Sequence, residues 1–280
     1  SNGRVMLYGQ SGSGKETAAR YIHHHSERSK SPFVVVNCAT IEPDRMEAVL
    51  FGIEGTTKSK SLGLLEQANG GTIYFDEVAD IPIETQAKIL RVLVEERFSK
   101  LDGFDSIKVD FRVISSTSQD LREAIERRQF REELFHRLNV VPIEVPSLED
   151  RGEDIPIIAE HFLEFFHNTQ GHPIRKLDKE AASLLQTMAW PGNIRQLGNI
   201  IERILILSDS GGPITADEIP KDSLENSNGP SSNVITPSLA TLPLRQAREA
   251  FEREYLIAQI KRFSGNISKT ANFVGMERSA

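Results

Sequence analysis

A glycine-rich stretch near the start of the chain, Gly9–Thr17, has the residue types and spacing of a phosphate-binding loop. An apolar run, Val5–Tyr8, leads into it, and a segment rich in Ala and Ile follows as a predicted helix. The glycines let several backbone N–H groups converge on a phosphate, the helix N-terminus adds partial positive charge, and Lys15 supplies a mobile ammonium. The predicted phosphate-binding residues are Gly9, Gln10, Ser11, Gly12, Ser13, Gly14, Lys15, Glu16 and Thr17.

The position after the lysine departs from the commonest phosphate-binding pattern, because it holds Glu16 instead of Ser or Thr. The hydroxyl that faces Mg²⁺ would then come from Thr17, or a water molecule would take its place. A glycine-rich turn that binds no ligand is the simpler alternative. The strand before the loop and the helix after it favour a nucleotide site.

A second chemical motif, Gly70–Glu77, is an apolar strand that ends in two adjacent carboxylates, Asp76 and Glu77. Folds of the α/β type place their ligands at the C-terminal ends of strands. Beside a phosphate-binding loop, Asp76 is suited to hold Mg²⁺ through water, and Glu77 is suited to orient and deprotonate a water molecule. Without the loop, two acids at a strand end would usually be a solvated turn. Together the two motifs predict a nucleotide hydrolase core.

Composition sets the broad class of the protein. The chain has 280 residues, 39% of them hydrophobic, as in soluble globular proteins. No apolar run is long enough to cross a bilayer and no signal peptide precedes the first strand, so we expect a cytoplasmic protein without a membrane partner. The single cysteine, Cys38, fits a reducing compartment and is interpreted as a small buried residue. The abrupt ends of the sequence lead us to expect a fragment of a longer protein.

Charge is distributed unevenly along the chain. The net charge is −7, yet residues 243–280 contain seven Lys or Arg residues against four Asp or Glu residues. A basic C-terminal segment on an otherwise acidic chain indicates that this segment is the part that would bind nucleic acid. A solvated helix face is the other interpretation of so few charges.

Short apolar runs that alternate with helical patterns predict the fold. The runs are rich in Val, Ile and Phe, with little polar alternation, which is typical of parallel strands buried on both faces. They lie at Val5–Tyr8, Phe33–Val36, Thr72–Phe75, Phe111–Ile114 and Val140–Val145, and helices are expected at Thr85–Glu95 and Leu121–Arg127. We therefore expect a doubly wound α/β core of parallel strands over residues 1–146.

Residues 147–220 have a purely helical pattern, which predicts a small helical lid domain over the nucleotide. The expected helices are Ile155–Phe166, Lys179–Met188 with Asp178 as N-cap, and Ile194–Leu207. Arg195 starts the third of them, where it could bridge to a phosphate. A linker rich in Ser, Asn and Pro is expected over residues 221–243.

The C-terminal segment, residues 244–280, begins with a broad apolar helical stripe that runs to Phe263. Such a face on a tail helix favours self-association. A short helix is expected through Phe273, followed by a turn and another helix start at Glu277. This order outlines a helix-turn-helix that stops before its reading helix.

Three adjacent histidines, His23, His24 and His25, invite a metal interpretation. Adjacent residues on a helix point in different directions, so the three cannot easily close on one ion. We interpret them as a solvated helix end.

Together the motifs resemble the central domain of the NtrC-type, sigma-54-dependent transcriptional activators, which are bacterial AAA+ ATPases. Gly9–Glu16 is similar to the Walker A motif of that family, in which Glu after the lysine is normal, and Gly71–Glu77 is similar to its Walker B motif. The resemblance covers nearly the whole chain and implies ATP or ADP with Mg²⁺ as ligands. It also implies that Asn37 holds the catalytic Glu77 in a nucleotide-dependent switch.

Phe130–Asn139 resembles the arginine-finger helix of the family. By that resemblance Arg131 and Arg137 reach the ATP of a neighbouring subunit, which implies self-association as a dimer or as a hexameric or heptameric ring. A basic surface on an amphipathic helix is the alternative. Trp190–Leu197 resembles the sensor II segment, which carries Arg195, and the tail resembles a Fis-type domain that binds promoter DNA.

Two segments depart from the family pattern. Its sensor I segment normally has Asn after Ala-Thr, whereas Ser116-Thr117-Ser118 stands here, so Ser118 offers a shorter hydroxyl at the catalytic position and we expect slow hydrolysis. The loop that contacts sigma-54 reads Gly-Ala-Phe-Thr-Gly-Ala in the family, and residues 55–60 contain no such motif. The missing aromatic anchor argues against sigma-54 as a partner.

Among the branches of the family, the chain most resembles the NtrX type, which are response regulators that share the loss of this loop motif. That likeness implies a sensor kinase as partner, through a receiver domain ahead of residue 1. The leading hypothesis is a two-component regulator in which an oligomerising ATP-binding core controls DNA binding by the tail. The alternatives are a sigma-54-remodelling ATPase that drives open-complex formation and a nucleotide-binding scaffold without turnover. A P-loop kinase of small molecules would leave the tail unexplained.

Overall fold

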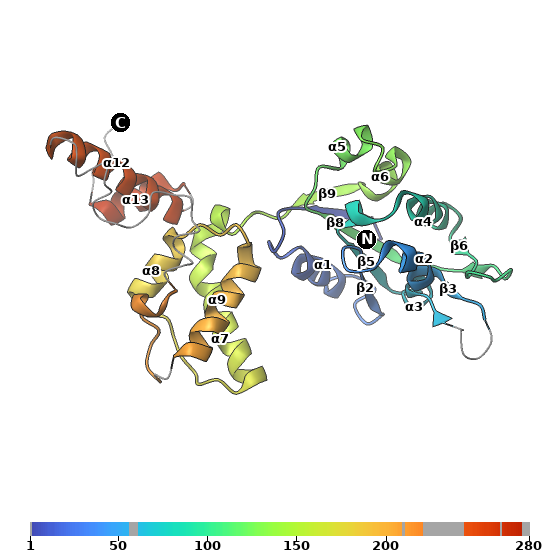
Figure 1. The fold of residues 1–280 in the computed structure, drawn as a ribbon, viewed down its shortest axis with the longest axis horizontal. Coiled ribbons are helices and arrows are strands. Elements are labelled where there is room, and N and C mark those ends of the chain that lie inside the picture. The colour runs from blue at the N-terminus through green and yellow to red at the C-terminus, as the bar shows by residue number, and fades with distance from the viewer. Residues whose placement is uncertain (1, 56–60, 209–210, 221–243, 264, 276–280) are drawn as a thin grey trace. The chain divides into compact units, whose positions relative to one another are not determined.

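In the computed structural model, residues 2–55, 61–208, 211–220, 244–263 and 265–275 are described. The chain forms two compact units, Ser1–Val145 and Pro146–Ala280 (Figure 1). Each unit has its own hydrophobic core. The expected linker over residues 221–243 and the expected helix start at Glu277 lie outside the described residues. None of the helices in the described part of the chain is long and apolar enough to span a membrane.

The first unit is built on a five-stranded sheet with the strand order β2-β5-β8-β1-β9, in which all neighbouring strands are parallel. The strands are β1 Val5–Tyr8, β2 Phe33–Asn37, β5 Thr72–Asp76, β8 Arg112–Thr117 and β9 Val141–Glu144. The expected α/β core is therefore confirmed. Strand β8 extends three residues beyond its expected end, because Ser115, Ser116 and Thr117 continue the buried strand as polar residues.

Helices cover both faces of the sheet. Helix α1, Lys15–His24, packs on one face against a core that includes Leu7, Tyr74 and Ile114. The larger core on the other face is formed with α2 Pro43–Phe51, α3 Leu64–Gln67, α4 Ile83–Glu95, α5 Leu121–Glu126 and α6 Glu132–Leu138. Right-handed crossovers explain this division, because the step from β1 to β2 runs across the sheet in the direction opposite to the later steps.

Smaller elements complete the first unit. A 3₁₀ turn, η1 Val78–Asp80, follows β5 directly. Two antiparallel ribbons pair β3 Gly52–Ile53 with β4 Ser61–Leu62, and β6 Arg97–Phe98 with β7 Ile107–Lys108. The ribbons were not anticipated from the sequence, because strands of two residues give too little periodicity. Helices α2 and α3 were not anticipated either.

The expectation that every strand is buried on both faces is wrong for β9. All four of its residues are exposed, including Val141 and Ile143. Strand β9 lies at an edge of the sheet beside β1. Its apolar side chains resemble those of the central strands, so the sequence pattern alone could not separate an edge strand from a buried one.

The interpretation of the three histidines as a solvated helix end is wrong for His23. Its side chain is 3% exposed, and its Nδ1 lies 3.0 Å from Oγ1 of Thr72. Burial lowers the pKa of His23 below its ordinary value. Within the described ranges, no group of three or more His, Cys, Asp or Glu residues could hold a metal ion. Cys38 is buried as expected, and burial raises the pKa of its thiol.

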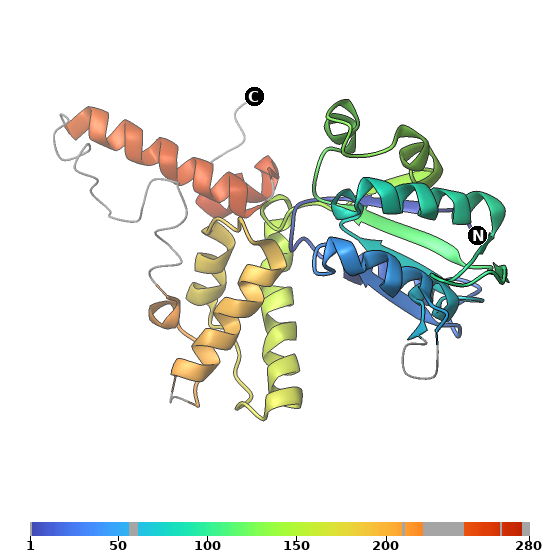
Figure 2. The ribbon, with the colours of Figure 1, turned by 45° about the vertical axis from the view of Figure 1, so that its right-hand side comes forward.

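The second unit is helical. Its main helices are α7 Ile155–Gln170, α8 Lys179–Thr187 and α9 Asn193–Leu207 (Figure 2). Their buried side chains form one core with Trp190. Two 3₁₀ turns, η2 Glu149–Asp154 and η3 Ala216–Glu218, flank them. The three helices expected from the sequence are confirmed, and Asp178 caps α8 by accepting a hydrogen bond from the N–H of Ala181 at 2.6 Å.

Two further helices, α12 Leu244–Arg262 and α13 Ile267–Val274, come from the tail. Asn266 caps α13 by accepting a hydrogen bond from the N–H of Lys269 at 3.1 Å. Arg262 donates to Gln186 Oε1 at 3.1 Å and to Ser183 Oγ at 2.9 Å, and both acceptors belong to α8. The broad tail helix and the short helix that was expected to precede the turn are thus present.

A buried ion pair stabilises the second unit. The Arg175 guanidinium, whose side chain is 1% exposed, donates to Glu218 Oε1 at 2.9 Å and to the carbonyl oxygen of Gly212 at 2.7 Å. The hydrogen bond from Arg175 lowers the pKa of Glu218 to about 2. The carboxylate is accordingly much more stable as an anion in the folded protein than in the unfolded chain.

Replacing Glu218 by Gln is expected to lower the free energy of unfolding by about 2 kcal/mol near neutral pH, because it leaves a buried guanidinium without its counter-charge. The folded-state pKa lies below the unfolded value, so this stabilisation is present above about pH 5 and is lost as the pH falls toward about 2. Denaturant unfolding followed by the fluorescence of Trp190, the only tryptophan of the sequence, measures the effect. A deficit equally large at about pH 3 would contradict it, and Asp217→Asn is the exposed control.

Candidate nucleotide-binding site

The predicted phosphate-binding loop joins β1 to α1 at the C-terminal end of the sheet. Gly12 and Gly14 have φ values of 76° and 100°, a left-handed conformation that glycine adopts without strain. A Cβ atom at Gly9 would lie 2.5 Å from the carbonyl oxygen of Val145, so this position excludes every side chain. Gly14 is the N-cap of α1, which leaves the first N–H groups of that helix directed toward the loop.

Lys15 is the buried cation of this loop, with 5% of its surface exposed. Its Nζ donates to the carbonyl oxygens of Gly9 at 2.8 Å and Gln10 at 3.2 Å, and it lies 2.9 Å from Glu77 Oε1. A buried ammonium requires such partners. The oxygens of a phosphate are of the same chemical kind, so they can replace these partners without leaving the charge unpaired.

The two predicted carboxylates lie at the end of β5. Asp76 is the last residue of the strand, and Glu77 follows with a φ of 56°, an unusual conformation for a residue with a side chain. Glu77 Oε2 accepts hydrogen bonds from the N–H of Ser118 at 2.8 Å and from its hydroxyl at 2.9 Å. Glu77 is therefore held from two sides, by Lys15 from the loop and by Ser118 from the end of β8.

The electrostatics at the end of β5 favour a cation. Burial, and then the neighbouring charge of Glu77, raise the pKa of Asp80, which also accepts a hydrogen bond from Gln119 Nε2 at 3.1 Å. Burial likewise raises the pKa of Tyr74 beneath Asp76, so its phenol stays protonated. Asp76 and the exposed Thr17 are too few ligands for a dedicated metal cage, but Mg²⁺ commonly binds through one or two protein groups together with phosphates. The residues present thus fit Mg²⁺ that arrives with a nucleotide.

The residue expected to act as a switch, Asn37, is the last residue of β2 and pairs in register with Asp76. Its side chain is exposed at the same end of the sheet. The contacts of the Glu77 carboxylate run to Lys15 and Ser118. The structure therefore brings Asn37 to the strand next to the carboxylates, while Lys15 and Ser118 are the residues that hold Glu77.

The two arginines expected to act between subunits lie at the start and near the end of α6. Nε of Arg131 donates to the carbonyl oxygen of Ile83 at 3.1 Å, and Nη2 of Arg137 donates to that of Leu93 at 3.0 Å. Both acceptors belong to α4 of the same unit. The remaining predicted site residue, Arg195, is an exposed residue in the first turn of α9.

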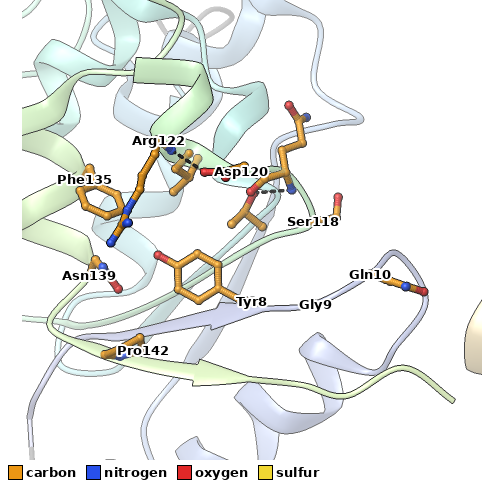
Figure 3. A pocket seen from close by; sticks show the side chains of 12 residues that line it. Tyr8, Gly9, Gln10, Ser118, Asp120, Arg122, Phe135, Asn139 and Pro142 are labelled. Carbon is orange, nitrogen blue, oxygen red and sulfur yellow. Dashed lines mark hydrogen bonds between the residues drawn. The ribbon is translucent and has the colours of Figure 1, made fainter. Parts of the chain in front are cut away.

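A cavity of about 590 Å³ opens beside the loop, between the ends of β8, β1 and β9 and the helices α5 and α6 (Figure 3). The ring of Tyr8 points from β1 toward Asn139 and Arg122. The cavity shares Gly9, Gln10 and Ser118 with the predicted site, and its other lining residues are Tyr8, Thr117, Gln119, Asp120, Leu121, Arg122, Phe135, Asn139 and Pro142.

Two buried hydroxyls beside Asp76, those of Tyr74 and Ser116, were not predicted from the sequence. The sequence contains one indication for each of these two hydroxyls. Strand alternation puts the side chains of Tyr74 and Asp76 on the same face of β5. Ser116 stands where the sensor I pattern of the resembling family has Ala.

The chain matches three family models, which follow one another along the sequence. Residues 1–144 match the Sigma-54 interaction domain, residues 149–234 match the AAA+ ATPase lid domain, and residues 247–280 match the bacterial regulatory protein, Fis family.

Individual relatives are consistent with these matches. The nitrogen assimilation regulatory protein NtrX of Azorhizobium caulinodans is 50% identical over 289 residues, which cover 100% of this chain and 62% of that protein. The crystal structures of NtrX from Brucella abortus in complex with ADP and with ATP are 50% and 51% identical, each with a TM-score of 0.85 over 99% of this chain. This chain covers 63% and 62% of those two chains, so it spans less than two thirds of the relatives it matches. The chain belongs to the Sigma-54 interaction domain family.

Proposed function

We propose that this chain is the ATP-binding central module of an NtrX-type two-component transcriptional regulator. It binds ATP or ADP with Mg²⁺ through the Gly9–Thr17 loop, self-associates so that arginines of one copy reach the nucleotide of the next, and controls binding of promoter DNA by the tail. A sensor kinase is the proposed upstream partner of the whole protein. The observation that carries the proposal is the 2.9 Å pair of Lys15 and Glu77, which joins the lysine of one motif to the acid of the other.

The geometry supports a definite division of labour at this site. A nucleotide phosphate competes with Glu77 for the Lys15 ammonium, because both are anions and the ammonium is a compact point charge. Glu77 is then released from Lys15 while Ser118 still holds its other oxygen, which leaves the carboxylate positioned to orient a water molecule. Mg²⁺, when bound, neutralises charge that develops on the phosphates, and Asp76 is its proposed protein contact through water. Arg195 is proposed as a further phosphate ligand.

A second candidate function is the remodelling of sigma-54, which the matched family model favours by its description. The loop expected to make that contact lacks the family motif, and residues 56–60 of it lie outside the described ranges. Mixing the protein with sigma-54, ATP and a transition-state mimic separates the two functions. A stable ternary complex supports remodelling, whereas promoter binding without such a complex supports the regulator.

Replacing Lys15 by Ala is expected to weaken ATP binding by about 10- to 100-fold, because a charge-assisted contact to phosphate is lost. Binding is measured by titration with an ATP analogue that carries a fluorescent ribose substituent. Lys88→Ala is the matched control, since Lys88 is a half-exposed lysine of α4 paired with Glu47. Equal affinity of wild type and Lys15→Ala, in folded protein, would overturn the nucleotide site.

A further inference from the structure

Three polar side chains lie in mutual contact beneath the predicted magnesium contact. The hydroxyl of Tyr74 lies 2.7 Å from Asp76 Oδ1 and 2.9 Å from Ser116 Oγ, and Ser116 Oγ lies 2.7 Å from the same Oδ1. Tyr74 and Ser116 are both 0% exposed. They come from the adjacent strands β5 and β8, whose register places Ile114 opposite Tyr74 and therefore Ser116 beside Asp76.

Two hydroxyl protons are available for these three contacts. A hydroxyl has one proton to donate, and the N–H of Glu77 already donates to Ser116 Oγ at 3.3 Å. When Ser116 and Tyr74 each donate to Asp76 Oδ1, the Tyr74–Ser116 contact is a close approach of two oxygens and not a third hydrogen bond. Both donors use Oδ1, so Oδ2 of Asp76 is the oxygen left to face a ligand beyond the end of the strand.

These contacts matter because a carboxylate at the end of a strand otherwise rotates about its side-chain torsions. Two neutral donors from buried positions restrict that rotation, and they do so without adding a charge that would compete with a cation. The stacked ring of Phe33, 6.0 Å from the Tyr74 ring, keeps the phenol in place from below. The cluster thus fixes the position of one carboxylate oxygen of Asp76 relative to the sheet.

We propose that Tyr74 and Ser116 are positioning residues that fix Asp76 so that its Oδ2 receives the hydrated Mg²⁺ of the nucleotide. This inference rests on the proposed function and adds a determinant of magnesium dependence to it.

The test compares Tyr74→Phe, Ser116→Ala and the double variant with wild type in binding of the fluorescent ATP analogue. The titration is made against Mg²⁺ concentration, and nucleotide affinity is also measured in excess EDTA. We expect the Mg²⁺ concentration at half-maximal effect to rise about tenfold, because loss of a residue that orients a metal contact typically costs about 10–100-fold in metal affinity. Affinity for the metal-free nucleotide should stay unchanged. Tyr21→Phe, at an exposed position of α1, is the matched control.

The outcomes separate this inference from the proposed function. Unchanged Mg²⁺ dependence in folded variants overturns the positioning role, as does an equal loss of affinity with and without Mg²⁺, which would indicate general damage to the site. If wild type binds no nucleotide, the proposed function fails first and the inference fails with it. Because Ser116→Ala removes a single oxygen atom, it tests the role even if Tyr74→Phe does not fold.

Discussion

Replacing Glu77 by Gln is expected to lower ATP turnover by about 10²–10⁴-fold, the range that a positioned general base contributes. The same replacement should leave nucleotide affinity unchanged or increase it. In the structure Glu77 Oε1 forms an ion pair with Lys15 Nζ at 2.9 Å. ATP therefore has to displace this carboxylate before the ammonium can reach a phosphate. An amide keeps the shape of the side chain and its contact with Ser118 but removes the competing charge.

Turnover is measured as phosphate release over a range of protein concentrations, and affinity is measured with the fluorescent analogue on the same preparations. Glu95→Gln is the control, because Glu95 is an exposed glutamate of α4 that pairs with Arg91. Full turnover in Glu77→Gln would remove Glu77 from the chemistry. Weaker binding in the variant would show that the pair with Lys15 helps to form the site instead of blocking it.

The two phosphate-site motifs were predictable from sequence because each is local. Lys15 is six residues from Gly9, and Glu77 follows the end of its own strand, so short-range spacing carries the information. The contact between Glu77 and Ser118 was not predictable in this way. It depends on β8 lying next to β5 in the sheet, and 41 residues separate the two side chains. Strand order arises from the packing of the whole unit.

The difference between local spacing and the arrangement of the elements also explains the incorrect predictions for His23 and β9. His23 was assigned to solvent from its two histidine neighbours, yet the helix turns its side chain inward, where Thr72 of β5 accepts or donates a hydrogen bond. Strand β9 was assigned to the interior from its apolar content, yet it lies at the sheet edge. Burial in each case is set by which elements are neighbours, and the local pattern gives only the type of element.

Replacing Arg131 or Arg137 by Ala is expected to lower ATP turnover by about 10³–10⁵-fold if the arginine acts on the nucleotide of a neighbouring copy. In the structure both side chains are bound to α4 of their own unit. Each donates one hydrogen bond to a carbonyl of α4, and a guanidinium has five N–H donors, so most of its capacity remains. Nε of Arg137 is a buried nitrogen without a hydrogen-bond partner among the described residues, an energetic cost that a phosphate oxygen could relieve through a shift of the side chain.

A mixing experiment distinguishes action between copies from a role within one copy. Arg137→Ala subunits bind nucleotide but lack the arginine, whereas Lys15→Ala subunits keep the arginine but bind poorly. In a head-to-tail ring, an equal mixture places an intact arginine against an intact loop at about a quarter of the interfaces, so turnover should recover to about that fraction. Arg91→Ala, at an exposed position of α4, controls for loss of charge. A mixture as inactive as its components would mean that Arg137 acts within its own unit, through its contact with Leu93, and that the ring model of catalysis is wrong.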